Sequence, residues 1–92
     1  MITYRLELEN NRVAAYDGST LAGECVFHTS GNYWIFDHTE VDSVYGGQGI
    51  AGKLVATAAE EAKKAGKKVL PVCSYAKHFF GKHKEYKDIL AI

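Results

Sequence analysis

Hydrophobic and polar residues alternate with a period of two along most of the N-terminal half of the chain. Within residues 2–9, Tyr4, Leu6 and Leu8 alternate with charged residues, as in a strand that buries one face. Asn10-Asn11 marks the first turn. The other strands predicted in this half cover residues 12–16, 21–28 and 33–41. Short turns between consecutive strands predict an antiparallel meander.

After the fourth predicted strand, the apolar spacing changes to that of a helix over residues 48–64. The apolar positions that recur along one face are Ile50, Leu54, Val55, Ala58 and Ala62. Gly66 is placed to end the helix, because glycine is common just past a helix C-terminus. Residues 68–72 predict a fifth strand, which must run parallel to the fourth because a helix connects them.

The end of the chain predicts short helices. Ser74 is placed to cap a helix that continues to about Phe80, and residues 84–90 predict another turn or two. The fold class expected is therefore α/β (α+β), with a mixed, mostly antiparallel five-stranded sheet, one long helix after the fourth strand and short C-terminal helices.

A glycine-rich stretch joins the fourth strand to the long helix. Gly46, Gly47, Gly49 and Gly52 interrupt the apolar pattern, and glycines here let the backbone turn while its N–H groups stay exposed at the positive end of the helix dipole. Such a loop suits a phosphate or pyrophosphate. The alternative is a helix that simply begins with a flexible turn. Neither the P-loop pattern nor the dinucleotide-binding glycine pattern is present.

Composition narrows the possible functions. The chain has 92 residues, 47% of them hydrophobic and 24% charged, which predicts one globular domain over residues 1–92. Eleven basic and eleven acidic residues give no net charge, which argues against nucleic acid as a partner. No apolar run is long enough to span a membrane, and no signal peptide is evident. We therefore expect a cytoplasmic protein. We also expect no metal site, because Cys25 and Cys73 lack zinc-type spacing.

The glycine stretch and a second segment together resemble a known family. Gly49 and Ala51 match the end of the coenzyme A pyrophosphate loop of the GNAT N-acetyltransferase superfamily, [Arg/Gln]-x-x-Gly-x-[Gly/Ala], although Gly46 replaces its Arg or Gln. With the segment from His38 to Val41 and the sequence Pro-Val-Cys-Ser-Tyr-Ala at 71–76, the chain resembles the minimal, single-domain GNAT-like branch.

The resemblance implies that acetyl-CoA is bound where the fourth strand meets the long helix. In that fold the fourth and fifth strands splay apart, and the pantetheine arm lies between them. The implied coenzyme-binding residues are Val41, Gly46, Gly47, Gln48, Gly49, Ile50, Ala51 and Gly52. Val41 would contribute backbone groups to the pantetheine amide or the thioester carbonyl.

Four side chains are candidates for chemistry on an amine acceptor. Cys73 precedes a predicted helix, whose N–H groups favour a nucleophilic thiolate, although a cysteine there can also be a small core residue. His38 and Glu40 lie on one strand face as possible general bases, or as plain surface residues. The resemblance places Phe80 where larger members have a proton-donating Tyr, so Tyr75 is the substitute candidate.

The basic residues of positions 77–84 either meet the coenzyme 3′-phosphate or form a solvated surface. We therefore expect an N-acetyltransferase that acts on an unidentified amine, with Cys73 as a possible acetyl carrier. Two rivals remain: an acyl-CoA binding or sensing module without turnover, which Phe80 favours, and a small interaction domain with no coenzyme.

Overall fold

The five predicted strands are present, in the predicted order. The computed structural model describes residues 1–91. Its strands are β1 (Ile2–Glu7), β2 (Arg12–Asp17), β3 (Thr20–Ser30), β4 (Tyr33–Val41) and β5 (Lys68–Pro71). They form one sheet in the order β1-β2-β3-β4-β5. The first four pair antiparallel, and β5 pairs parallel with β4, as the helix crossover required.

Two α-helices and three short 3₁₀ helices complete the fold. The α-helices are α1 (Ile50–Lys64) and α2 (Ser74–Lys82), and the 3₁₀ helices are η1 (Leu8–Asn10), η2 (Ser43–Tyr45) and η3 (Lys84–Ile89). As predicted, α1 ends just before Gly66, which takes a left-handed φ of 71°. Among the described residues, no helix is both long and apolar enough to cross a membrane.

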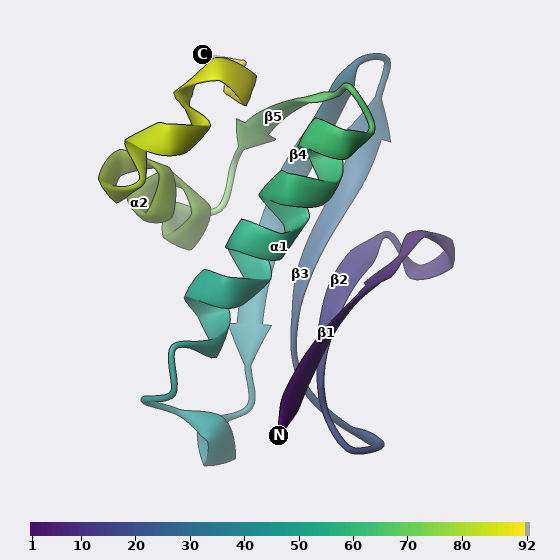
Figure 1. Cartoon of the computed structure of the whole chain (residues 1–92), viewed down its shortest axis with the longest axis vertical. Helices are drawn as coiled ribbons and strands as arrows, with labels where there is room; N and C mark the ends of the chain where they lie inside the picture. Colours follow the sequence, from purple (N-terminus) through teal and green to yellow (C-terminus); the bar gives the residue numbers. More distant parts are fainter. Residues whose placement is uncertain (92) are drawn as a thin grey trace.

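The core lies between α1 and one face of the sheet. In Figure 1, α1 lies across the sheet, while α2 and η3 lie beside β5. The apolar stripe of α1 is buried as its spacing predicts. From the sheet, Phe27 stacks on Trp34 with 4.5 Å between ring centroids, and Phe36 packs between Phe27 and Phe80 of α2.

Some predicted boundaries were wrong. The first strand ends at Glu7 rather than at residue 9, because the chain turns through η1 to Asn11, which has a left-handed φ of 51°. The long helix begins at Ile50 rather than at residue 48, since Gly47 and Gly49 take positive φ angles that an α-helix excludes.

An irregularity in register changes the facing of the last part of β4. Val26 pairs with His38 while Phe27 pairs with Phe36, so Asp37 is an extra residue in β4. Side chains alternate afresh beyond it, and Thr39 comes within 3.9 Å of the sulfur of Cys73 on the core side. His38 and Glu40 therefore point to the other face.

The strands β4 and β5 part at their C-terminal ends. Their pairing stops at Phe36 and Pro71. There the chain turns away into α2, while the N–H groups of Val72 and Cys73 both donate to the carbonyl oxygen of Phe36, at 3.0 and 3.1 Å. Within residues 1–91, no strand pairs with 37–41 on the side of β4 that faces β5. This stretch of edge is open.

Candidate active site

The loop between β4 and α1 takes its shape from two glycines. Gly47 has a φ of 79° and Gly49 a φ of 75°, a region that glycine enters without the steric penalty of a Cβ. Gly49 is the N-cap of α1 and brings no side-chain cap. A Cβ built on either glycine would meet nothing within 4 Å. The conformation, and not crowding by the protein, therefore calls for glycine at both positions.

The amides that follow are left without protein acceptors. Gly46 N–H donates to the carbonyl of Ser43, and Lys53 N–H donates to that of Gly49. Between them, the N–H groups of residues 47–52 donate to no backbone or side-chain acceptor in the described chain. They lie at the positive end of a 15-residue helix. Unpaired amides of this kind form an anion site.

These amides line a cavity together with residues from three other segments. All eight predicted coenzyme-binding positions line it: Val41, Gly46, Gly47, Gln48, Gly49, Ile50, Ala51 and Gly52. Tyr45 of η2 and Tyr75 of α2 complete the lining. The hydroxyl of Tyr75 lies over α1, 3.4 Å from where a Cβ on Gly52 would stand. The structure therefore brings Tyr75 to the loop.

Tyr45 is a lining residue that the sequence reasoning missed. Its hydroxyl donates to Asp17 Oδ2 at 2.9 Å, which ties η2 to the end of β2. This hydrogen bond and the nearby Asp17 charge raise the pKa of Tyr45 above its usual value. The sequence signal that could have indicated this role is the aromatic residue directly before the first glycine of the loop, Gly46. The hydrogen bond between Tyr45 and Asp17 holds the side of the cavity that Tyr45 forms.

Cys73 lies at the start of α2, where it replaces the predicted cap. Ser74 was expected to cap this helix, but the N-cap is Cys73, whose sulfur accepts from Ala76 N–H at 3.3 Å. Cys73 is partly exposed and faces Thr39 of the open β4 edge. Cys25 differs, because it is fully buried and burial raises the pKa of its thiol to about 12. Only Cys73 is placed for chemistry.

His38 and Glu40 are not brought to Cys73. Both are exposed on the sheet face away from α1. His38 Nε2 lies 3.7 Å from a carboxylate oxygen of Glu24. Ligand atoms of Glu24, His38 and Glu40 lie within 4.8 Å of one another, but Arg12 already binds Glu24 at 2.9 Å. The arrangement gathers these charged side chains on the exposed sheet surface.

The basic residues of positions 77–84 do not act as one cluster. His83 and Lys53 line a groove that begins at Gly49 and Gly52, beside the anion site. Lys77 and Lys84 line a separate cavity. Of the basic residues at 77–84, His83 lines the groove beside the loop, together with Lys53.

Comparison with known proteins identifies the family. The sequence matches the profile of the family described as GCN5-related N-acetyl-transferase over residues 12–89. The chain belongs to this family. A search of curated proteins finds no match.

Solved structures of GNAT proteins share the fold. A GCN5-like protein from Staphylococcus aureus, assigned as an N-acetyltransferase, is 29% identical, with a TM-score of 0.72 and coverage of 98% of this chain and 86% of that one. A ribosomal-protein-alanine N-acetyltransferase from Brucella melitensis biovar Abortus 2308 is 22% identical (TM-score 0.59), covering 88% of this chain and 61% of that one.

A third structure, assigned as a streptothricin acetyltransferase from Bacillus anthracis, contains acetyl coenzyme A. It is 22% identical, with a TM-score of 0.55, and the match covers 71% of this chain and 42% of that one. The match spans 42% of the Bacillus anthracis chain and 61% of the Brucella melitensis chain, less than two thirds of either. At this identity they show the GNAT fold alone.

Proposed function

We propose that this chain, as one domain over residues 1–92, binds acetyl-CoA in the cytoplasm and transfers the acetyl group to an amine. The observation that carries the proposal is the set of unpaired amides at 47–52, which line a cavity at the start of α1. Family membership supports the same function. So does the acetyl coenzyme A bound to the Bacillus anthracis protein.

The residues present fit the coenzyme along its length. The amides of 47–52 suit the pyrophosphate. Lys53 in the adjoining groove suits the 3′-phosphate, whereas His83 there already lies 3.4 Å from Glu85. The open edge of β4 offers backbone groups near Val41 to the pantetheine amides. Bound acetyl-CoA would supply an activated acetyl thioester.

Two side chains near the open edge are proposed to act in transfer. Tyr75 presents a hydroxyl to the cavity and is the proposed proton donor to the coenzyme thiolate. Cys73, held by Ala76 N–H and next to Thr39, is the proposed acetyl carrier. His38 and Glu40 are proposed as bases for an amine that approaches from the opposite sheet face.

A second candidate is an acyl-CoA binding module without turnover. Phe80, at the position where the family's larger members have a Tyr, is buried against Phe36 and Tyr86 and brings no hydroxyl. If Tyr75 cannot replace that hydroxyl, the thiolate lacks a proton donor. Binding would then persist without transfer.

Binding and turnover should be measured separately on the full chain. Titration calorimetry with coenzyme A tests binding. Acetyl-CoA with spermidine or a lysine-containing peptide tests transfer, for wild type, Tyr75→Phe and the matched control Tyr33→Phe, whose ring is exposed on β4. We expect Tyr75→Phe to lower transfer by roughly 10²- to 10⁴-fold, the usual contribution of general acid–base catalysis. Binding by wild type without any transfer would favour the module.

Intact-protein mass tests the role of Cys73. After incubation with acetyl-CoA, we expect one added acetyl group in wild type and none in Cys73→Ala. Unchanged transfer by Cys73→Ala would refute a thiol carrier and leave direct transfer to the amine. Absence of coenzyme A binding in wild type would refute both candidate functions.

A further inference from the structure

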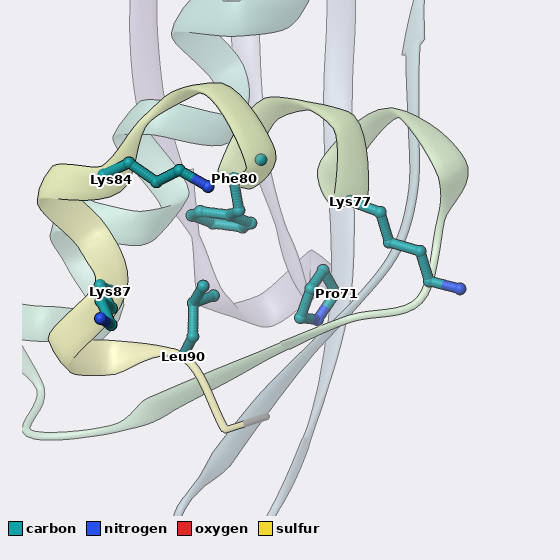
Figure 2. A pocket seen from close by; sticks show the side chains of 7 residues that line it. Pro71, Lys77, Phe80, Lys84, Lys87 and Leu90 are labelled. Carbon is teal, nitrogen blue, oxygen red and sulfur yellow. The ribbon is translucent and has the colours of Figure 1, made fainter.

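A second cavity lies on the other side of α2 and shares no lining residue with the coenzyme cavity. It has a volume of about 430 Å³, within the range of small-molecule sites. Its apolar lining comes from Pro71 of β5, Phe80 of α2 and Leu90 after η3. Figure 2 shows these three side chains around a common space, so α2, the end of β5 and the segment after η3 each contribute a wall.

Three lysines line the rim of this cavity, although the ammonium group of Lys77 points away from Phe80 and Leu90 (Figure 2). Lys77 comes from α2, and Lys84 and Lys87 come from η3. Within the described chain, the ion pairs formed by lysine side chains involve Lys64 alone. The side-chain hydrogen bonds given by lysines are those of Lys67 and Lys68. The three ammonium groups at the cavity therefore have no protein partner among residues 1–91.

The two acidic residues of η3, Glu85 and Asp88, form no ion pair with these lysines in the described chain. Glu85 of η3 lies 3.4 Å from His83, on the side of the groove that adjoins α1. Three lysines without an ion-pair partner among residues 1–91 therefore lie at the rim of one apolar cavity. An occupant with a matching surface has an anionic head and an apolar body. A bare phosphate would leave the apolar lining unused, and an amine would be repelled.

We propose that this cavity binds a small carboxylate with an apolar body, of the medium-chain fatty acid class. The carboxylate lies beside Lys84 and Lys87, and the hydrocarbon chain covers Pro71, Phe80 and Leu90. The proposal does not rest on coenzyme binding, because the two cavities have separate linings.

The test is a titration of the isotope-labelled full chain, followed by amide NMR signals, with octanoate as the probe. We expect saturable shifts confined to residues 71–90. Hexanoate should bind about 15-fold more weakly, since each buried methylene contributes roughly a factor of four. Octylamine, with the same chain and the opposite charge, should cause no saturable shift there. An equal response to octylamine would overturn the proposal.

Two variants separate the site from general surface effects. Gly81 lines the cavity within α2, and a Cβ built on it meets nothing within 4 Å. We expect Gly81→Leu to keep the fold, because leucine favours a helix more than glycine, and to lose octanoate binding by filling the space. The double variant Lys84→Gln/Lys87→Gln should weaken octanoate binding at least tenfold.

The matched control is Lys63→Gln/Lys64→Gln on α1, which should bind octanoate like wild type. Undiminished binding by Gly81→Leu would overturn the proposal. So would displacement of octanoate by coenzyme A, which would assign the signals to the coenzyme site. A glutamate-rich peptide that bound here more tightly than octanoate would also overturn it, in favour of a protein partner.

Discussion

The substitution Gly49→Ala tests the anion site most sharply, because its effects on stability and on coenzyme affinity can be measured separately. The residue has a φ of 75° and open space around it. A Cβ in this conformation costs about 1–2 kcal/mol, which an ordinary domain with a stability of roughly 5–15 kcal/mol survives. For a chain of this size, the melting temperature should fall by roughly 4–16 °C. The variant remains folded at room temperature.

The effect on coenzyme affinity is a separate quantity. The added methyl group enters the cavity where unpaired amides would meet a phosphate. Loss of one hydrogen bond to a charged group costs about 1.5–3 kcal/mol, so the Kd for coenzyme A should rise roughly 10- to 150-fold. Titration calorimetry at a temperature well below the melting point of the variant measures this change.

Gly18→Ala is the matched control. Gly18 has a φ of 62°, equally open surroundings and no place in the cavity lining. It should lose a similar amount of stability and bind coenzyme A like wild type. If Gly49→Ala bound coenzyme A as tightly as Gly18→Ala does, the loop would not be the anion site and the reasoning would fail.

Three further predictions concern the thiols, an ion network and the loop support. Iodoacetamide at neutral pH should label Cys73 in the folded protein and spare buried Cys25, as peptide mass mapping would show; equal labelling would contradict the structure. Hydrogen bonds from Tyr16 and Arg12 hold the pKa of Glu7 below its usual 4.5, so its stabilisation is present above that pH and fades below it. Glu7→Gln should therefore destabilise the fold at pH 7, with a smaller difference from wild type in acid melts. Tyr45→Phe removes the bond to Asp17 and should weaken coenzyme A binding more than it lowers the melting temperature; an unchanged Kd would refute that role.

Local patterns were sufficient to predict the sheet order and the long helix. Period-two alternation gave the meander, and the connection through α1 required β5 to run parallel to β4. The glycine loop was also predictable, since Gly47 and Gly49 are needed for their backbone angles. These features depend on residues close together in the chain.

Features that depend on contacts between distant segments were not predictable. The extra residue at Asp37 decides which of Thr39 and His38 faces Cys73, and nothing in the alternation marks it. Cys73 and not Ser74 caps α2, because the chain turns at Val72 and Cys73, whose N–H groups both donate to the carbonyl of Phe36 in β4. The lysine-lined cavity exists only because η3 folds back beside β5, where Leu90 bridges to Val69.

The open stretch of β4 at 37–41 has a consequence for how the protein behaves in solution. Unpaired N–H and C=O groups along a strand favour pairing with a strand from another molecule. Coenzyme A lying along this edge would shield it. Protein prepared without coenzyme should therefore self-associate at high concentration, and light scattering should fall when coenzyme A is added.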